Sequence, residues 1–252
     1  MEKARRIKLI IEYDGTAYVG WQRQKNGPTV QAAIERILGL MTGEPVSLHG
    51  AGRTDAGVHA LGQVAHFSTS KDLDPAVYKQ ALNKLLPDDI VIREALEVKP
   101  DFHARYSAAG KTYRYLILNR RTPSAFTRNQ VWHYPRELDL AAMAECLRMI
   151  EGKHDFSSFR NTGSNTRSPV RTVLKQGIER NEDGLITITL SADGFLRQMV
   201  RNIVGTLVEA GRGKITPTDF KEILAARDRS KAGPTAPPQG LYLVEVDYGR
   251  RG

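Results

Sequence analysis

The chain has 252 residues, with 37 Lys and Arg against 28 Asp and Glu, a formal charge of +9 and a pI near 9.7. Its 40% hydrophobic and 26% charged residues are typical of a globular protein with a packed core, and exclude a disordered or fibrous chain. The single cysteine, Cys146, excludes an intramolecular disulfide and a cysteine-based zinc or iron–sulfur site. No apolar run reaches the roughly 20 residues of a membrane helix, and residues 1–8 lack the apolar stretch of a signal peptide, so we expect a cytoplasmic protein.

The surplus of positive charge is confined to the second part of the chain. Residues 1–104 contain 13 basic and 13 acidic residues, whereas residues 105–252 contain 24 basic and 15 acidic residues. A basic surplus alone is a weak indication of a nucleic-acid partner, because many proteins have basic faces that contact only solvent. Its confinement to one part favours a protein with one half that faces a polyanion.

Strands and helices alternate in a fixed order along the first part. Runs of β-branched or alternating apolar residues predict strands, and apolar residues at helical spacing close after a proline predict helices. The predicted order is β-α-β-β-α-β. The elements are strand 7–13, helix 28–41, strands 46–50 and 63–68, helix 75–86 and strand 89–96.

The second part repeats this order with two additions, an aromatic segment around Trp132 and Tyr134 and a short helix 218–226. We therefore expect an α+β fold of two ferredoxin-like (βαββαβ) domains, residues 1–104 and 105–252, whose antiparallel sheets form a central cleft. A Pro, Gly and Ala-rich stretch at 229–239 predicts a surface loop. The repeated elements are strand 112–119, helix 138–150, strands 173–180 and 185–191, helix 195–210 and strand 241–248.

Several common catalytic motifs are missing from the sequence. There is no P-loop, no zincin motif and no hydrolase nucleophile elbow. The six histidines are scattered, and no two have the spacing of metal ligands on a helix. We therefore expect neither a metal nor a cofactor.

The segment AGRTDAGVHA at 51–60 follows a predicted strand and contains Asp55. A plain turn is one interpretation, since Asp and Gly are common in turns. The loop has about a dozen residues, however, where a hairpin needs only about two to five, and long loops in compact domains are more often functional. Arg53 favours the ionised form of Asp55, and an ionised, partly desolvated carboxylate is a nucleophile or a general base.

Seven blocks of sequence resemble the tRNA pseudouridine synthase A family, which converts uridine to pseudouridine in the anticodon stem-loop of tRNA. The string GRTDAGVH is similar to the signature loop of that family. The other blocks have the same order as in the family and span nearly the whole chain, which makes the resemblance specific. They are EYDG with GWQRQ at 12–24, DFHAR at 101–105, YRY at 113–115, FSSFR at 156–160, MVRNIVG at 199–205 and GLYL at 240–243.

The resemblance implies a homodimer that isomerises uridine at positions 38, 39 or 40, with one tRNA contacting both subunits. Asp55 stands at the place of the catalytic aspartate, and Arg201 at that of the arginine expected to pair with it. Tyr113 matches the tyrosine that packs on the target base, and Arg53 an arginine implicated in drawing the nucleotide out of its stack. The reaction needs no redox change, phosphate donor or metal. Extrusion of the base costs about a few kcal/mol.

The residues themselves leave alternatives open. In the helix predicted at 195–210, Arg197, Arg201 and Gly205 share one face, which is either a solvated polar face or a face toward an anion. Cations in the first turns oppose the helix dipole, and the Asp55 carboxylate or an RNA phosphate would remove this penalty. Tyr113 and Tyr115 point to the same side of their strand. We expect the Tyr115 ring to lie in the core of the sheet and the Tyr113 ring to lie beside the target base.

Phosphate contacts from a basic surface would supply the energy of base extrusion, with binding that weakens as salt rises. We expect the site in the cleft between the domains. The candidates for phosphate contacts are Arg197, Arg105, Lys111, Arg114, Arg120, Arg121, Arg160, Arg167, Arg171 and Lys175. We expect Cys146, in the helix predicted at 138–150, to be a small buried hydrophobic residue.

Two other functions compete with this interpretation. A non-catalytic RNA-recognition module has the same order of elements, but its R-G-F-G-F-type strand is absent from this sequence. A small-molecule isomerase would act on free uridine and would be indifferent to salt. The sequence leaves open which tRNAs and which of the three uridines are used, and whether the aspartate forms a covalent adduct or an elimination intermediate.

Overall fold

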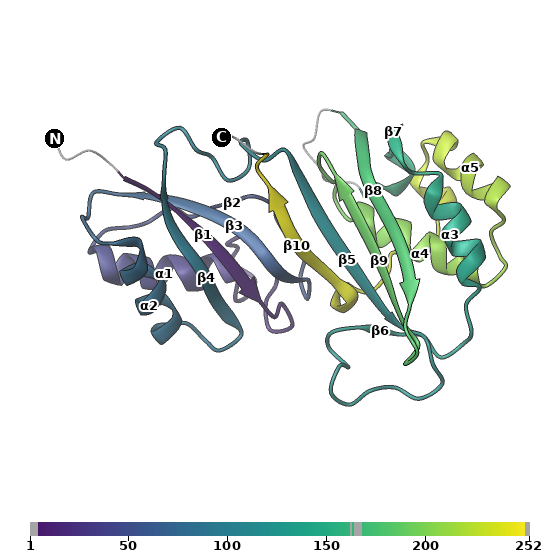
Figure 1. Ribbon diagram of the computed structural model, residues 1–252, viewed down its shortest axis with the longest axis horizontal. Coiled ribbons are helices and arrows are strands. Elements are labelled where there is room, and N and C mark those ends of the chain that lie inside the picture. Colours follow the sequence, from purple (N-terminus) through teal and green to yellow (C-terminus); the bar gives the residue numbers. More distant parts are fainter. Residues whose placement is uncertain (1–4, 162, 164–167, 250–252) are drawn as a thin grey trace. The chain divides into compact units, whose positions relative to one another are not determined.

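The computed structural model describes residues 5–161, 163 and 168–249, and their contacts divide the chain into two units. Unit 1 comprises residues 1–109 and 242–252, and unit 2 comprises residues 110–241. Both units are α+β, with helices packed on a sheet (Figure 1). Unit 2 has 21 basic and 13 acidic residues, so it carries a formal charge of +8.

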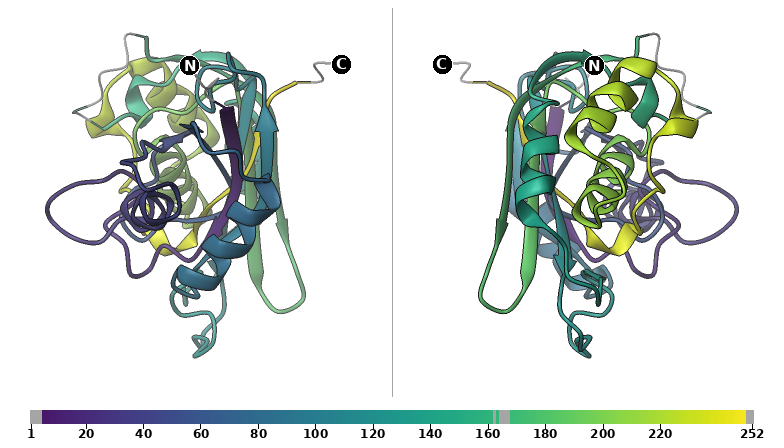
Figure 2. Two further views of the ribbon diagram at one scale, coloured as in Figure 1. Left: turned by 90° about the vertical axis from the view of Figure 1, so that its left-hand side faces the viewer. Right: turned by 90° about the vertical axis from the view of Figure 1, so that its right-hand side faces the viewer.

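In unit 1, helices α1 and α2 lie on one face of the sheet (Figures 1 and 2). Strands β4, β1 and β3 are neighbours and antiparallel, while the other edge of β3 pairs with β2 and with β10. The predicted order of elements is confirmed for residues 1–104. The elements are β1 (Arg5–Tyr13), α1 (Val30–Thr42), β2 (His49–Gly50), β3 (His59–Thr69), α2 (Pro75–Leu85), β4 (Ile90–Val98) and β10 (Leu241–Asp247).

The last strand, β10, pairs in parallel with the start of β3, where Tyr242 lies opposite His59. Its residues from Tyr242 onward therefore belong to unit 1, although the predicted boundary placed them in the domain 105–252. Strand pairing depends on contacts distant in sequence, and the local pattern of this strand predicts its presence but not its partner.

Local chemistry explains the elements of unit 1. Alternate residues of β1 face the helices and are fully buried, as a strand covered on one side requires. Helix α1 begins after Thr29, whose hydroxyl accepts the Ala32 N–H, and ends at Gly43 in the left-handed conformation, φ +72°. Tyr78 of α2 packs edge-on against Phe67 of β3, with ring centroids 5.3 Å apart.

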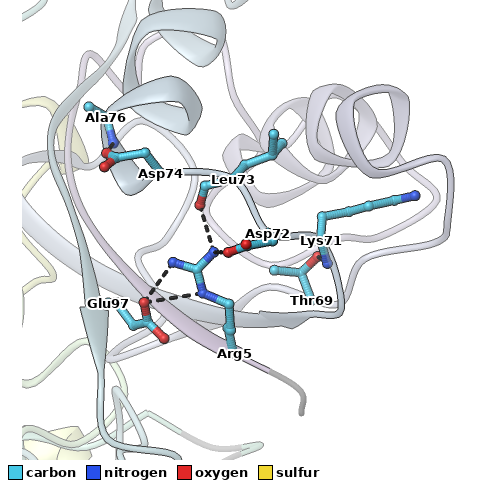
Figure 3. A network of polar contacts seen from close by, with 8 residues as sticks. All are labelled: Arg5, Thr69, Lys71, Asp72, Leu73, Asp74, Ala76 and Glu97. Carbon is cyan, nitrogen blue, oxygen red and sulfur yellow. Dashed lines mark hydrogen bonds and ion pairs between the residues drawn. The ribbon is translucent and has the colours of Figure 1, made fainter. Parts of the chain in front are cut away.

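A polar cluster around Arg5 ties β1 to β4 and to the segment before α2 (Figure 3). The Arg5 guanidinium donates to Glu97 at 2.6 Å, to Asp72 at 2.8 Å and to the carbonyl of Leu73 at 3.0 Å. The hydrogen bond between Arg5 and Glu97 raises the pKa of the guanidinium and lowers the pKa of the carboxylate. Since the cluster is exposed, it positions these segments more than it stabilises them.

In unit 2, β5, β9, β8 and β7 form an antiparallel sheet, and β6 pairs in parallel with β5. Helices α3, α4 and α5 pack together on one side (Figures 1 and 2). Strands β6 and β7 were not predicted. The elements are β5 (Gly110–Leu118), β6 (Trp132–His133), α3 (Leu140–Arg148), β7 (Gly152–Asp155), β8 (Val170–Arg180), β9 (Leu185–Ala192), α4 (Met199–Gly211) and α5 (Pro217–Ala226), with short 3-10 turns at Ser157–Phe159, Arg229–Lys231 and Pro238–Gly240.

Helix α4 is the centre of the core of unit 2, and the segment 229–240 crosses it closely. A Cβ on Gly205 would lie 1.7 Å from the carbonyl oxygen of Pro234, so only glycine allows this crossing. Ala236 is buried in the same segment. The prediction of a plain surface loop at 229–239 was wrong, because much of this loop covers a helix. Cys146 of α3 is fully buried, as predicted.

Helix α4 begins at Met199, four residues later than predicted. Gln198 adopts the left-handed conformation, φ +59°, and its side-chain oxygen accepts a hydrogen bond from Asn161. The apolar pattern continues through the turn before the helix, which explains the error. Arg197 thus precedes the helix and does not share a helical face with Arg201, so the dipole argument applies to Arg201 alone. Within the described ranges, no helix has the length and apolar character needed to cross a membrane.

Candidate active site

The loop of residues 51–58, the Asp loop, connects β2 to β3, and hydrogen bonds to its backbone carbonyls hold it in place. The side chain of Gln63 in β3 donates to the carbonyl of Gly52 at 2.8 Å. On the other side, the Trp21 N–H donates to the carbonyl of Thr54 at 3.2 Å. The Asp loop is therefore held between β3 and the segment that follows β1.

Two glycines allow this segment to lie directly against the Asp loop. Gly20 has φ +112°, and a Cβ there would lie 2.6 Å from the Thr54 oxygen and 3.2 Å from the Asp55 carbonyl carbon. A Cβ on Gly15 would lie 2.0 Å from the carbonyl oxygen of Val58. Since real Cβ contacts are not this short, both positions require glycine. The EYDG and GWQRQ blocks thus hold the Asp loop in place.

The side chains of the Asp loop differ in their exposure. Thr54 is buried, and its hydroxyl is 2.8 Å from the Tyr13 hydroxyl. Burial raises the pKa of Tyr13 to about 12, so this phenol remains neutral at physiological pH. Arg53 is exposed and Asp55 is half-buried. The loop therefore presents a carboxylate from a fixed backbone, which is the arrangement that a nucleophile or general base requires.

In unit 2, Tyr113 and Tyr115 lie on the face of β5 that is covered by helices. Tyr115 is fully buried, and its hydroxyl donates to the carbonyl of Pro237 at 2.7 Å. Its place in the core is as predicted, and burial raises its pKa well above the usual range. Tyr113 is 8% exposed and contacts Phe195 edge-on, with ring centroids 4.9 Å apart. Its ring plane is therefore fixed.

Arg201 lies in the first turn of α4 and is half-buried. Its Nε donates to the carbonyl of Ala236 at 2.7 Å, and the Ala236 N–H donates to the Arg201 carbonyl at 3.0 Å. This two-way contact fixes the direction of the side chain. It also explains why the segment 229–240 must cross α4.

The guanidinium of Arg229 organises the surroundings of Arg201, a role that the sequence did not reveal. It donates to Asn161 at 3.1 Å, to Asn202 at 3.0 Å, to Thr235 at 3.1 Å and to the Gly233 carbonyl at 3.0 Å. All of these acceptors are neutral, and burial lowers the pKa of Arg229. The network joins the start of α4 to the segment that contacts Arg201.

The predicted phosphate contacts do not form one cluster. Arg114 lies opposite Thr189, and Lys175 opposite Ser191, so both point to the face of the sheet opposite to Tyr113. Arg105 belongs to unit 1, where its guanidinium lies over the exposed Tyr106 ring. Arg167 lies outside the described residues. The others are half-buried (Lys111, Arg160, Arg171) or exposed (Arg120, Arg121, Arg197).

Three histidines that are distant in sequence meet in unit 1. The ring centroids of His49 and His66 are 5.2 Å apart, and those of His66 and His103 are 4.7 Å apart. Burial lowers the pKa of His66 to about 4, and also lowers that of His103. In the part of the chain that the structure describes, no group of three or more His, Cys, Asp or Glu side chains is arranged to hold a metal.

Comparison with known proteins identifies the family. A family model described as tRNA pseudouridine synthase matches residues 9–107 and 147–249. The chain belongs to the tRNA pseudouridine synthase family. The matched ranges include the Asp loop and Arg201, whereas Tyr113 lies between them.

Relatives named tRNA pseudouridine synthase A match over nearly the full length. The chain is 53% identical to that of Acetivibrio thermocellus and 50% identical to that of Ruminiclostridium cellulolyticum, in each case over 97% of this chain and 100% of the relative. The chain is 45% identical to the relative from Sinorhizobium fredii, over 96% of this chain and 99% of the relative. Among solved structures, a Cbf5-Nop10-Gar1 complex has a TM-score of 0.35 at 14% identity, covering 80% of this chain and 45% of that one. Assignment to the pseudouridine synthase family therefore rests on sequence.

The residues that position the motifs of this pseudouridine synthase family member were not predicted from the sequence. Gly20, Thr54 and Gln63 fix the Asp loop, and Arg229 fixes the neighbourhood of Arg201. Gly20 and Thr54 lie within the blocks of family resemblance, which indicated their importance but not their role, whereas Gln63 lies outside these blocks. No local pattern around Arg229 distinguishes it from a solvated cation.

Proposed function

We propose that the protein isomerises uridine to pseudouridine in tRNA, at one or more of positions 38, 39 and 40 of the anticodon stem-loop. The observation that carries this proposal is the 45–53% identity, over at least 96% of the chain, to relatives named tRNA pseudouridine synthase A. The fixed Asp loop supports it, because a catalytic carboxylate must be held in place by its surroundings.

Asp55 is the catalytic carboxylate in this proposal. The N1–C1′ glycosidic bond breaks with its electron pair left on the uracil, and the uracil turns within the site. A C5–C1′ bond then forms, C5 releases its proton, and N1 gains a proton, so that the product is an isomer of uridine. Asp55 starts this sequence either by attacking C1′ or by removing a proton from the ribose. The backbone contacts of Gly52 and Thr54 keep its position constant during these steps.

Three further side chains act on the substrate. Arg201 pairs with the Asp55 carboxylate and stabilises its ionised form, while Tyr113 packs on the uracil, a contact worth about 1 to 3 kcal/mol. The Phe195 contact supports this role, because a ring of fixed plane keeps the detached base oriented. The exposed position of Arg53 supports its role in drawing the nucleotide from the stack.

We extend the proposal to the architecture and the assembly. Two ferredoxin-like domains, with the boundaries of units 1 and 2 in place of the predicted 1–104 and 105–252, would form the cleft that receives the extruded base, in a cytoplasmic homodimer. The strand order β4-β1-β3-β2 with two helices on one face supports this for the first domain. The charge of +8 on unit 2 supports the second as the main tRNA-binding part.

Release of tritium from C5-labelled uridine in tRNA tests the proposal. Wild type should release the label, and Asp55→Asn should reduce turnover by about 10²- to 10⁴-fold or more while retaining tRNA binding. Asp88→Asn is the matched control, since it removes an exposed carboxylate from the same unit. Wild type without release, or Asp55→Asn with full turnover, would disprove the proposal.

The same assay separates the two competing functions. A non-catalytic RNA-binding module would bind tRNA without releasing the label. A small-molecule isomerase would act on free uridine or uridine monophosphate with tRNA withheld. We expect label release only with tRNA, and release that weakens as salt rises.

A further inference from the structure

A basic pocket of about 530 Å³ lies in unit 2 beyond the carboxyl end of β5. Its lining residues follow the end of β5 and include the last residue of β8. Figure 1 shows the end of β5 and the turn from β8 to β9. Arg120 and Arg121, which line it, are among the phosphate contacts expected from the sequence, and no other part of the proposed reaction uses this place. The residues that line it include Asn119, Arg120, Arg121, Arg136, Glu137 and Arg180.

Asn119 organises the walls of this pocket. Its amide side chain donates to the carbonyls of Tyr134 at 2.9 Å and Arg136 at 2.6 Å, and its side-chain oxygen accepts from Arg180 at 2.6 Å. Its backbone N–H donates to the carbonyl of Gly184, in the turn between β8 and β9, at 2.8 Å. Three segments are thus joined around one side chain, so the pocket is fixed by the fold.

The pocket gathers four cations without matching carboxylates. Among the described residues, none of the four arginines has a carboxylate oxygen within 4.0 Å, although Glu137 also lines the pocket. Arg121 and Arg136 make no side-chain hydrogen bond to a described residue, so their donors face the pocket or solvent. Like charges gathered in this way repel each other, and an anion removes the repulsion. The planar guanidinium groups match the oxygens of a phosphate.

One observation favours a phosphate of RNA over a free anion, and a second separates the pocket from the site of the target nucleotide. The loop that begins at Arg120 also exposes Phe126, which is 93% accessible, in a turn closed by the hydrogen bond from the Thr127 N–H to Ser124. An exposed aromatic ring close in sequence to arginines is typical of surfaces that follow a nucleic-acid strand. In addition, Arg120 lies seven residues beyond Tyr113, roughly 20 Å along an extended chain. The pocket therefore lies too far from Tyr113 to hold the target nucleotide.

We propose that the pocket of Arg120, Arg121, Arg136 and Arg180 binds a backbone phosphate of the tRNA roughly 20 Å from the target uridine. This inference rests on the proposed function for the identity of the RNA. The site contributes binding energy equally to the ground state and the transition state, because it does not contact the reacting atoms. Its loss therefore raises KM and leaves kcat unchanged.

The test is the double variant Arg121→Gln with Arg136→Gln, compared with Arg148→Gln, which removes an exposed cation from α3. We expect KM for tRNA and the Kd in filter binding to rise about tenfold, with kcat unchanged. The slope of log Kd against log salt should become shallower by about 1, as expected for one lost phosphate contact. A double variant that behaves like Arg148→Gln, or one that loses kcat at constant KM, would overturn the inference.

Filter binding and a phosphate titration distinguish failure of this inference from failure of the proposed function. Filter binding needs no turnover, so it tests this site even if wild type isomerises nothing and the proposed function fails. Titration with inorganic phosphate, followed by thermal unfolding, tests the free anion. Protection of wild type but not of the double variant, with an unchanged Kd for tRNA, would show a site for free phosphate and would overturn the proposal of an RNA contact.

Discussion

Replacing Gly20 by alanine tests whether the segment after β1 sets the position of Asp55. The new Cβ would lie 2.6 Å from the Thr54 carbonyl oxygen, 3.2 Å from the Asp55 carbonyl carbon and 3.3 Å from the Ala56 nitrogen. All three are backbone atoms, which cannot move aside by a change of rotamer. The segment or the Asp loop must therefore shift.

The size of the effect follows from the geometry. A backbone at φ +112° costs an alanine about 1 to 3 kcal/mol, and the overlap with the Asp loop adds about 1 to 3 kcal/mol. Relief of the overlap requires a shift of roughly half an ångström or more. Since a misplacement of about 1 Å costs about 10²-fold in rate, we expect kcat to fall by about 10- to 100-fold for Gly20→Ala. The Kd for tRNA should change little, because no phosphate contact is altered.

Gly43→Ala is the matched control, because Gly43 is also left-handed, φ +72°, but a Cβ added there would have no other atom within 4 Å. This variant should lose about 1 kcal/mol of stability and keep wild-type kcat. Tritium release gives kcat, and urea unfolding gives the stability of each variant. If Gly20→Ala retains wild-type kcat, or if both variants lose equal stability, the segment does not position Asp55.

Three further predictions concern other parts of the protein. The pKa of His66 is about 4 in the folded protein and 6.5 ordinarily, so between these pH values the unfolded chain binds a proton that the folded chain does not. The free energy of unfolding should therefore fall by about 2 kcal/mol as pH drops from about 7 to about 4. The variant His66→Gln should flatten this pH dependence, measured by urea unfolding. Arg229→Lys should lower the free energy of unfolding by about 2 to 3 kcal/mol and kcat about tenfold, because a single ammonium cannot reach Asn161 and Asn202 together. An unchanged kcat would refute the link between Arg229 and Arg201. Thr216→Ala removes the capping box of α5 and should cost about 1 kcal/mol in thermal unfolding without changing kcat.

The sequence predicted those features that depend on neighbouring residues. Apolar stripes located α1, α2 and, apart from its start, α4, and Cys146 and Tyr115 are buried as predicted. The two-residue strand β6 and the four-residue strand β7 are too short to have a period. The left-handed Gln198 interrupts an apolar pattern that continues through it, so the start of α4 was misplaced.

Long-range contacts in the candidate site were beyond the reach of pattern analysis. The motif around Asp55 was evident, but the fit of Gly20 against it depends on a close approach between two loops. The neutral partners of Arg229 likewise come from three separate segments. The meeting of His49, His66 and His103 depends on how the sheet and a loop pack together. Such features require the folded chain.

The route of the chain through β10 determines the order in which the protein assembles during synthesis. All of unit 2 leaves the ribosome before β10 does, so unit 2 is complete while unit 1 still lacks a strand. Until then, the edge of β3 at His59 and Ala60 is without its parallel partner, and Tyr242 is not yet stacked on His59. The Asp loop ends directly before His59, and the strand that supports this point is therefore synthesised after the whole of unit 2. Chains still on the ribosome would have a complete basic unit before the Asp loop has all of its supporting contacts.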